Sequence, residues 1–355
     1  MSCFSWKPLR VCLAALACLL AAPVPAAITY QRVTVGDAGN ANDAGGFGAV
    51  AHDYQIGRYD VTIGQYAAFL NAVAATDTTS LYHSSMATDL NIAGISRSGS
   101  SGSYSYSVIG SADRPITYVS WFDAARFANW MANGQPTGAQ NATTTENGAY
   151  DLIGAAAGTA PAKNATNPNT SAAPTFYLPT ENEWYKAAYY SPTLNGGAGG
   201  YYAYATQSNT APGNVVGTAA NQANYRNGVF TVTQSSTYSS TQNYLTDVGA
   251  FSGSGSYYGT FDQSGNVYQW TDRAGYADSF RGLRGGDWYN LGPVSVSSLQ
   301  AYSFAPSFEG GFYGFRLASP AGGPAVPEID PNGLSAALGL IGGGLGLLER
   351  RRYGR

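Results

Sequence analysis

Apolar residues recur at helical spacing in three segments of the chain, and each segment begins with polar residues typical of a helix start. The first segment starts at Thr62. With Gln65, this residue has the spacing of a capping box, in which two side chains bond two backbone N–H groups. The apolar positions that follow lie at i, i+3, i+4 and i+7 and are Tyr66, Phe69, Leu70 and Val73. The pattern predicts a helix after Thr62 with one buried face.

Two further helix starts have the same signature. Asp123 follows Ser120 by three residues, and Glu183 follows Thr180 at the same spacing, which is the clearest capping box in the chain. Strands are expected just before the first two helices. Residues 54–57 alternate in polarity, and a short strand is expected to run from Arg114 into the second helix. In the third helix, the positions expected to pack inward are Trp184, Ala187 and Ala188.

Two polar stretches interrupt this pattern. The serine-rich segment 96–107 is predicted to be a low-complexity polar loop. Residues 133–173 are rich in Gly, Ala, Thr and Asn and are predicted to form an excursion with little helix. We also expect Arg114, the capping acids and later arginines to form a buried charge network, whose pairing the sequence leaves open.

Both ends of the chain carry signals rather than core patterns. Residues 1–27 have the charged, apolar and small-residue regions of a secretion signal peptide. At the other end, Pro327 and Glu328 precede an apolar Gly/Leu stretch and a cluster of arginines, an order that resembles the PEP-CTERM sorting signals of Gram-negative bacteria. We therefore divide the chain into a signal peptide (1–27), one domain (28–320), a linker with the Pro-Glu motif (321–332) and a hydrophobic helix with arginines (333–355).

The sorting resemblance implies export through the inner membrane to the cell surface or extracellular matrix. It also implies a membrane transpeptidase as a partner, which removes the C-terminal helix, so that this helix is either transient or retained. The apolar stretch is slightly shorter than the ~20 residues usually needed to span a bilayer. Two alternatives stay open, an ordinary C-terminal membrane helix and lipidation at Cys18.

Composition narrows the class of partner. Only 11% of the residues are charged, and Lys163 and Lys186 are the only lysines after the signal peptide. The polarity comes from uncharged side chains and 27 tyrosines, which suits an exported matrix protein. A net charge of −3 without a basic stripe argues against nucleic acid as a partner.

Six short motifs in one order suggest a family. They are YDVTIGQYAAFL (59–70), ITYVSWFDAARFANW (116–130), LPTENEWYKAA (178–188), GNVYQWTD (265–272), RGGDW (284–288) and GFRLA (314–318). Together they resemble the framework of formylglycine-generating enzymes, also called sulfatase-modifying factors, over about residues 50–320. The resemblance implies an α+β fold, the formylglycine-generating-enzyme variant of the C-type lectin fold. This fold is loop-rich, with a small antiparallel sheet and few helices.

The chemistry that the resemblance implies is missing from the sequence. Members of the family hold copper(I) on two cysteines between the RGG and GFR motifs and oxidise a substrate cysteine with oxygen. The matching stretch, 289–313, has no Cys, His or Met, and the thiol positions fall near Ser295 and Leu299 or Gln300. A serine hydroxyl neither binds copper(I) like a thiolate nor carries out thiol redox chemistry. The only cysteines, Cys3, Cys12 and Cys18, lie in the signal peptide, so copper is not expected.

Other catalytic readings are weaker. The only histidines are His52 and His83, too few for a zinc site or an iron triad, and His52 is expected to be a loop histidine. The carboxylates of Asp123 and Glu183 have the right chemistry for acid–base work, but helix capping explains both more simply. We therefore assign no catalytic residue, and whether the chain is an enzyme stays open.

The family resemblance also implies structural calcium at two places. One set matches Ser264, Gly265, Val267 and Gln269, largely through backbone carbonyls, and the other matches Asn224 and Tyr225. Oxygen-rich loops suit this hard cation. Gln269 stands where the family usually has a carboxylate, which removes one negative charge and weakens the site. An Asx turn at 262–266 without metal is the alternative.

Three functions follow from these observations. The first is a secreted, noncatalytic binding or matrix protein that holds a peptide or glycan ligand. The second is a formylglycine-generating-type oxidase that modifies a protein substrate by an unrecognised mechanism, and the third is a hypervariable display protein on the same fold. Tyrosine pairs offer stacking area for a ligand if they are exposed rather than core residues. These lie at 104–106, 189–190, 201–204 and 257–258.

Overall fold

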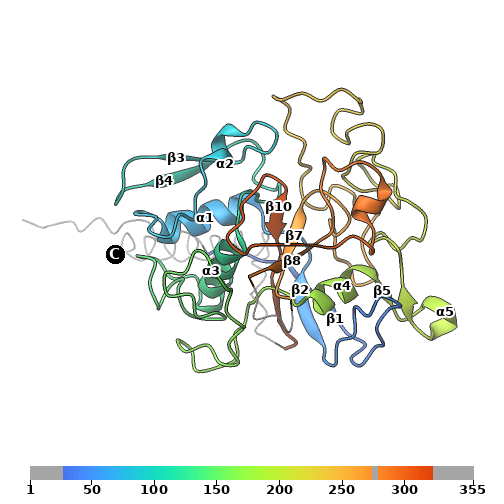
Figure 1. Cartoon of the computed structure of the whole chain (residues 1–355), viewed down its shortest axis with the longest axis horizontal. Coiled ribbons are helices and arrows are strands. Elements are labelled where there is room, and N and C mark those ends of the chain that lie inside the picture. The colour runs from blue at the N-terminus through green and yellow to red at the C-terminus, as the bar shows by residue number, and fades with distance from the viewer. Residues whose placement is uncertain (1–26, 274–278, 323–355) are drawn as a thin grey trace, which may run out of the picture.

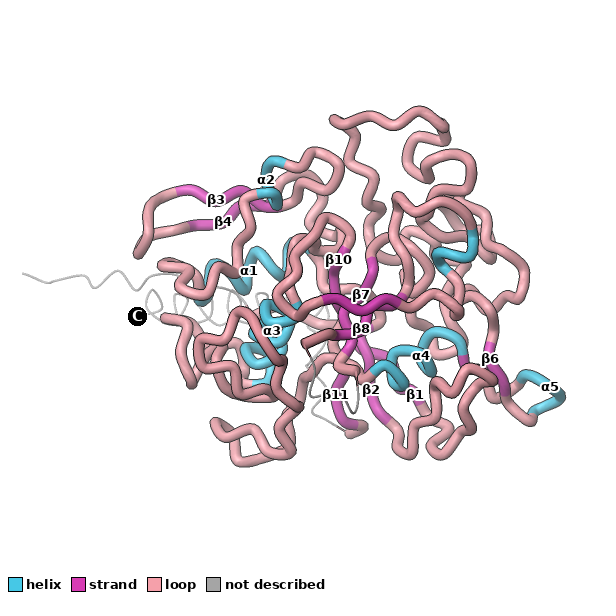
Figure 2. Tube along the Cα trace, in the orientation of Figure 1, coloured by secondary structure: helices cyan, strands magenta, loops and turns pink. Residues whose placement is uncertain are grey.

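The computed structural model describes residues 27–273 and 279–322, and loops and turns make up most of this trace (Figure 2). The helices of this part are α1 (Ile63–Val73), α2 (Ser85–Thr88), α3 (Trp121–Ala132), α4 (Glu181–Tyr189), α5 (Leu194–Gly197) and the 3₁₀ turn η1 (Pro293–Val296). The strands are β1 (Arg32–Val35), β2 (Tyr54–Gly57), β3 (Ile95–Ser98), β4 (Ser105–Val108), β5 (Tyr190–Ser191), β6 (Gly200–Tyr201), β7 (Tyr268–Thr271), β8 (Arg281–Arg284), β9 (Tyr302–Phe304), β10 (Tyr313–Phe315) and β11 (Ala318–Pro320).

Two small sheets organise the centre. One has the order β1-β2-β11 and is antiparallel throughout, and it joins the first strand of the domain to the last. The other has the order β10-β7-β8-β9 and is antiparallel except for the parallel pair β10–β7. In Figure 1, β7, β8 and β10 lie between the pair α1 and α3 on one side and α4 on the other. The arrangement confirms the predicted class, an α+β fold with few helices and small sheets.

All three predicted helix starts are confirmed. Thr62, Ser120 and Thr180 each accept a hydrogen bond from the backbone of the residue three positions later, whose side chain bonds back to the cap. The predicted inward positions of α1 are all buried, and α3 is buried along its whole length. Phe69 of α1 packs against Phe127 and Trp130 of α3, with ring centroids 5.3 and 5.2 Å apart. In α4, Trp184, Ala187 and Ala188 are buried as predicted.

The expected strand from Arg114 into the second helix is wrong. Only one isolated bridge forms there, between Thr62 and Pro115. Tyr118 has a φ of 56°, a left-handed conformation that a strand does not tolerate and that aromatic residues rarely adopt. The segment therefore reaches α3 as a kinked loop.

The prediction of a polar loop at 96–107 is also wrong, except at its tip. The strands β3 and β4 form an antiparallel hairpin in which Ile95 pairs with Val108. Tyr106 is buried against the core, and the Arg97 guanidinium lies 4.3 Å from the ring of Tyr104 and 4.7 Å from that of Tyr82. These contacts stabilise the hairpin, although its serines give no alternating pattern in the sequence.

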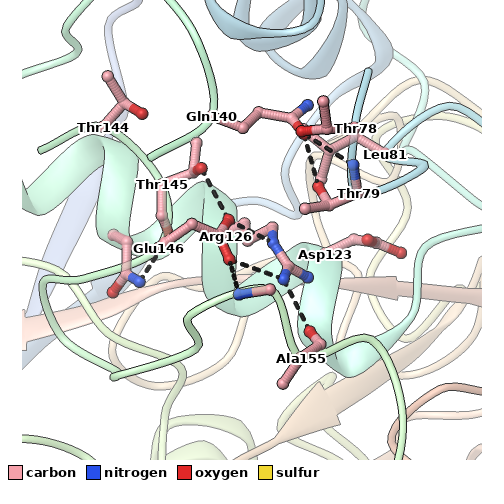
Figure 3. A network of polar contacts seen from close by, with 12 residues as sticks. Thr78, Thr79, Leu81, Asp123, Arg126, Gln140, Thr144, Thr145, Glu146 and Ala155 are labelled. Atoms are coloured by element: carbon pink, nitrogen blue, oxygen red, sulfur yellow. Dashed lines mark hydrogen bonds and ion pairs between the residues drawn. The ribbon is translucent and has the colours of Figure 1, made fainter. Parts of the chain in front are cut away.

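The helix-poor excursion is confirmed, since no helix or strand forms between 133 and 173. A buried ion pair between Arg126 of α3 and Glu146 anchors this segment (Figure 3). The Arg126 guanidinium donates to both carboxylate oxygens of Glu146, at 2.7 and 2.9 Å, and to the carbonyl of Ala155. Burial pushes the pKa of Glu146 upward, but the hydrogen bonds and charge of Arg126 outweigh burial and hold this pKa below its usual value. Asn129 of the same helix donates to the carbonyls of Thr145 and Tyr150.

Buried arginines pair with acids elsewhere as well, but not with the capping acids. Arg316 and Asp60, both fully buried, lie 2.8 Å apart, and Arg284 bonds Glu181 at 2.7 Å. Burial raises the pKa of Asp60 to about 8 against the opposing charge of Arg316. The expected network therefore exists as separate pairs, none of which joins Arg114 to a capping carboxylate.

The ends of the chain stay untested. The predicted signal peptide, apart from Ala27, and the predicted helix at 333–355 lie outside the described residues. Within 27–273 and 279–322, no helix combines the length and apolarity that a membrane crossing requires.

Candidate ligand-binding cleft

The turn after β8 presents two aromatic side chains. Gly285 and Gly286 have φ values of 105° and 81°, and a Cβ on Gly286 would lie 2.3 Å from the carbonyl oxygen of Ser295. Only glycine fits such a left-handed, crowded position. The chain then turns sharply, which buries Trp288 and leaves the next residue, Tyr289, 43% exposed.

Asp287 fixes this turn. Its Oδ1 accepts hydrogen bonds from the backbone N–H groups of Tyr289 and Asn290, at 2.8 and 2.7 Å, and its Oδ2 accepts from the Asn290 side chain. Burial raises the pKa of Asp287 to about 6, although these hydrogen bonds oppose the shift. The backbone N–H of Trp288 donates to the carbonyl of Asn266. The two aromatic residues are therefore held by bonds on both sides.

A loop after α2 forms the facing wall. Asp89 accepts a hydrogen bond from the backbone N–H of Asn91, and the Asn91 side chain donates to the carbonyls of Ser239 and Gln242 at 2.8 Å. The Tyr238 hydroxyl donates to Asn91 in return. This exchange attaches the distant segment 238–242 to the wall and places the Tyr238 ring, 49% exposed, next to Tyr289.

The strained residue Tyr118 closes the floor. Its hydroxyl donates to Asp89 Oδ2 at 2.9 Å, and its backbone N–H donates to the carbonyl of Gly310. A Cβ on Gly311 would lie 3.2 Å from Asp89 Oδ2 and 3.3 Å from the Tyr118 ring, so glycine leaves room there. Backbone strain of this kind persists where the surroundings enforce it and is common at functional sites.

Together these segments enclose a cleft of about 430 Å³, called the aromatic cleft below. Its lining residues are Asp89, Asn91, Tyr118, Tyr238, Trp288, Tyr289, Gly311 and Phe312. The Trp288 ring stacks on Tyr244 at 4.8 Å with an 8° interplanar angle and meets Tyr289 edge-on at 5.4 Å. The indole N–H of Trp288 is buried and has no acceptor among the described residues.

A histidine and a carboxyl lie beside the cleft. The His83 ring stacks on Tyr118 at 4.9 Å, and its Nε2 lies 3.7 Å from Glu309 Oε2. Burial raises the pKa of Glu309 to about 8, helped by the charges of Asp123 and Asp77, and burial lowers the pKa of His83. Both shifts favour the uncharged forms, so near neutral pH the contact joins two neutral groups rather than an ion pair.

The positions matched to the family's thiols do not line this cleft. Ser295 lies in η1, where its hydroxyl donates to the carbonyl of Gly292, and Leu299 is 85% exposed. Gln300 donates its backbone N–H to Ser297. The cleft instead uses Tyr289 and Phe312, near the two ends of this stretch, and Trp288, directly before it.

The two groups of residues predicted to bind calcium lie next to each other. Asn224 and Gly265 pair in a parallel bridge, and a Cβ on Gly265 would lie 2.2 Å from the Asn224 carbonyl oxygen. Three of the carbonyl oxygens here already accept hydrogen bonds. That of Asn224 accepts from Asn266, that of Gly265 from Val267, and that of Tyr225 from two side chains.

The side chains of the predicted calcium group are engaged too. The amide oxygen of Gln269 accepts from Trp184 Nε1 and from Arg316 Nε, both at 2.6 Å, and the Ser264 hydroxyl donates to the carbonyl of Val296. A guanidinium on the ligand oxygen opposes a bound cation. This arrangement does not fit calcium as it stands, and nothing below depends on the metal. Calcium binding stays a prediction.

The remaining candidates have structural partners. His52 Nε2 lies 3.3 Å from Glu183 Oε1 with most of its side chain exposed, and Asp123 and Glu183 each complete a capping box. Most of the predicted tyrosine pairs contribute to the core. Tyr106, Tyr189, Tyr190 and Tyr204 are buried, whereas Tyr257 is 40% exposed.

Sequence reasoning missed most of the cleft. It singled out the stretch 289–313 but not Asp89, Tyr118 or Tyr238, which come from three distant segments. The one local signal was the pair Trp288–Tyr289 directly after two glycines, since a glycine turn followed by aromatic residues often presents them at a surface.

The sequence and fold of this chain resemble those of known proteins. The family model described as "Sulfatase-modifying factor enzyme 1-like domain" matches residues 35–321, which supports the predicted fold class. No curated protein matches the sequence. Similar solved structures include CarF, at 21% identity and a TM-score of 0.45 over 82% of this chain and 98% of that one. Variable protein 1 of Treponema denticola has 16% identity and a TM-score of 0.47 over 84% and 98%, and PvdO of Pseudomonas aeruginosa has 18% and 0.41 over 82% and 91%.

Proposed function

This chain belongs to the sulfatase-modifying factor enzyme 1-like family, and we propose that it uses the family's fold for binding rather than for oxidation. In this proposal it is a secreted or surface-sorted protein that holds a peptide or glycan in the aromatic cleft. The observation that carries the proposal is the cleft itself, whose lining includes rings near both ends of the stretch that corresponds to the family's copper-binding thiols. Exposed aromatic side chains around a concave site are typical of ligand recognition.

The chemistry of the stretch 289–313 supports a noncatalytic role. Its side chains include no thiol, imidazole or thioether, so none supplies a soft ligand for copper(I). Among the described residues, no cluster of three or more His, Cys, Asp or Glu side chains is placed to hold a metal ion. The proposal therefore assigns the cleft residues to contact with a ligand and assigns none of them to a redox step.

The sorting signals supply the location in this proposal. The signal peptide at 1–27 exports the chain, and the segments at 321–332 and 333–355 direct it to the cell surface or extracellular matrix. A transpeptidase at the inner membrane would act on the C-terminal segment. A ligand outside the cell is then the natural partner, and nucleic acid is not.

One other function is favoured by a specific observation. Family membership favours a formylglycine-generating-type oxidase that acts without its own thiols on a protein substrate. The two functions differ in their dependence on copper and oxygen. The oxidase needs both to convert a substrate cysteine, whereas a binding protein needs neither.

The test is a direct assay for oxidation. The full-length protein is incubated with copper(I), oxygen and a cysteine-containing peptide with a sulfatase motif, and mass spectrometry monitors the loss of the thiol and the gain of an aldehyde. An active formylglycine-generating enzyme serves as the positive control. We expect no conversion above the rate without protein. Conversion that depends on copper would overturn the proposal.

A further inference from the structure

We propose that the ligand of the aromatic cleft is a neutral oligosaccharide and that one pyranose ring stacks on Tyr289. This inference rests on the proposed function and names its ligand class. Three properties of the cleft carry the inference: two half-exposed rings at a right angle, a carboxylate acceptor and a buried indole donor among the lining residues, and the absence of a lysine or arginine in the described lining.

The open rings are the first property. Tyr289 and Tyr238 are 43% and 49% exposed, and their rings meet at 6.1 Å with an interplanar angle of 83°. One face of each ring is taken by a neighbour, since Tyr238 stacks on Tyr244 at 6.0 Å and Tyr289 lies tilted against Phe312 at 5.8 Å. Trp288 stacks on Tyr244 and Tyr118 stacks on His83, which leaves the exposed parts of Tyr289 and Tyr238 for a ligand. A flat apolar C–H face of a pyranose fits one exposed ring, while the perpendicular ring limits its position.

The polar groups are the second property. The carboxylate of Asp89 accepts one hydrogen bond on each oxygen, from Asn91 and from Tyr118, and a carboxylate has about four acceptor sites. The Trp288 indole N–H has no acceptor among the described residues, although this side chain is only 3% exposed. An unpaired buried donor is costly and calls for a partner. A sugar hydroxyl can donate to the carboxylate, and it can accept from the indole N–H once the Trp288 ring turns towards the cleft, because this atom is closed to solvent as the ring stands.

Charge is the third property. The described lining contains Asp89 and no lysine or arginine, and Glu309 lies beside it. An anionic ligand such as a uronate or a phosphate finds no counter-charge there. A quaternary ammonium ligand needs several open ring faces around it. Here the faces of Trp288 and Tyr118 are occupied, and an N–H group repels a cation rather than bonding it.

The inference is tested by isothermal titration calorimetry on the full-length protein with three classes of probe. The neutral class contains cellohexaose, maltohexaose and the hexamer of N-acetylglucosamine, the anionic class trigalacturonate, and the cationic class choline and a trimethyl-lysine peptide. We expect binding to at least one neutral probe. Tyr289→Ala should weaken it about tenfold, the scale of losing a central aromatic contact.

Two further variants sharpen the result. Trp288→Phe keeps a ring but removes the N–H, and it should weaken binding about fivefold if a hydroxyl accepts from that group. Tyr257→Ala is the matched control, because Tyr257 is an equally exposed tyrosine (40%) that does not line the cleft. This variant should leave affinity unchanged, and circular dichroism confirms that all variants are folded.

Each other outcome overturns the inference in a recognisable way. Binding of choline or the trimethyl-lysine peptide that depends on Tyr289, without sugar binding, replaces the ligand class but keeps the binding function. Sugar binding that survives Tyr289→Ala places the site elsewhere. Absence of binding by every probe rejects a neutral oligosaccharide. The binding function itself stands or falls with the separate copper-dependent oxidation assay.

Discussion

The excursion 133–173 and the aromatic cleft are both built from loops, but they treat their side chains in opposite ways. In the excursion, buried polar side chains bond the backbone, as Asn129 does at the carbonyls of Thr145 and Tyr150. Around the cleft, apolar side chains stay in solvent, with Tyr289 43% and Leu291 68% exposed. The backbone of the first region is bonded by buried polar side chains, whereas the second region leaves aromatic rings exposed.

This difference separates structural loops from functional ones. A loop without helix or strand must find partners for its backbone groups, and Asn, Thr and Gln side chains provide them locally. Exposed rings contribute little to stability by comparison. Side chains that are held in place by buried bonds and still exposed, as Tyr289 is by Asp287, are therefore better explained by a ligand than by folding.

The largest expected effect is a loss of stability in the excursion 133–173. Glu146→Ala leaves the fully buried guanidinium of Arg126 without its carboxylate, and removing one partner of a buried pair costs about 3–5 kcal/mol. We expect a loss of this size in the free energy of unfolding, measured by urea denaturation, while ligand affinity of the folded protein stays unchanged because the pair does not line the cleft.

Arg97→Ala is the matched control for that prediction. Arg97 pairs with the buried Asp77 at 3.3 Å and lies over the rings of Tyr82 and Tyr104, but about a third of its side chain is exposed, so solvent screens these contacts. Exposed ion pairs and exposed cation–π contacts each contribute about 0–1 kcal/mol, so Arg97→Ala should cost less than Glu146→Ala. If Glu146→Ala were no more harmful than Arg97→Ala, the excursion would not depend on its buried pair.

The same contrast explains what the sequence could predict. The caps at Thr62, Ser120 and Thr180 depend on residues three positions apart, so local spacing predicts them. The hairpin β3–β4 was not predicted because the serines on its exposed faces give no alternating pattern. The burial of Tyr106 depends on its contact with the end of α1, which no local pattern reveals.

The cleft could not be predicted from the sequence for a different reason. Its lining comes from segments near residues 90, 118, 238, 288 and 311, and no local period links positions so far apart. The left-handed backbone of Tyr118 also depends on tertiary contacts, since its neighbours in sequence favour a strand. Family motifs predicted the scaffold, but not which rings line the cleft.

The second expected effect comes from narrowing the aromatic cleft while the excursion 133–173 stays unchanged. Gly311 lies against Asp89 and Tyr118, and its backbone is not left-handed, so a side chain is tolerated by the main chain but intrudes into the cleft. Gly311→Val should lower the free energy of unfolding by about 1 kcal/mol through crowding. It should lower affinity for the sugar by more than the Trp288→Phe change, as calorimetry would show. Unchanged affinity would mean that the ligand does not reach this part of the cleft.

A third, smaller effect is a pH dependence next to the cleft. Burial raises the pKa of Glu309 from 4.5 in the unfolded chain to about 8, so the folded chain binds this proton more tightly. Stability from this group is therefore greatest at low pH and falls as the pH rises from about 4.5 to about 8. Because 24% of the side chain is exposed, solvent reduces the effect, and His83, Asp77 and Asp123 share it.

Glu309→Gln isolates that contribution, because the amide keeps the shape of the protonated carboxyl and cannot ionise. Melting temperatures of the wild type and the variant should converge near pH 5 and separate towards pH 8.5, with the variant the more stable at the alkaline end. Parallel curves would show that Glu309 is ionised in the folded chain like an ordinary surface carboxylate.

The smallest effect tests whether a metal holds the cleft wall. The backbone N–H of Trp288, in the cleft wall, bonds the carbonyl of Asn266, which follows Gly265 in the chain. The predicted calcium ligands include Gly265, Asn224 and Gln269. Since their oxygens already accept hydrogen bonds and Arg316 places a positive charge on Gln269, bound calcium would have to displace existing contacts. We expect EDTA and millimolar calcium to give melting temperatures within about 1 °C of each other, because a ligand stabilises only as far as it binds the folded state. Gln269→Glu restores a carboxylate against Arg316 and should not create calcium dependence on its own. A rise of several degrees with calcium in the wild type would instead make the wall of the cleft a metal-supported structure, and its stiffness would then come from an ion rather than from the hydrogen bonds described above.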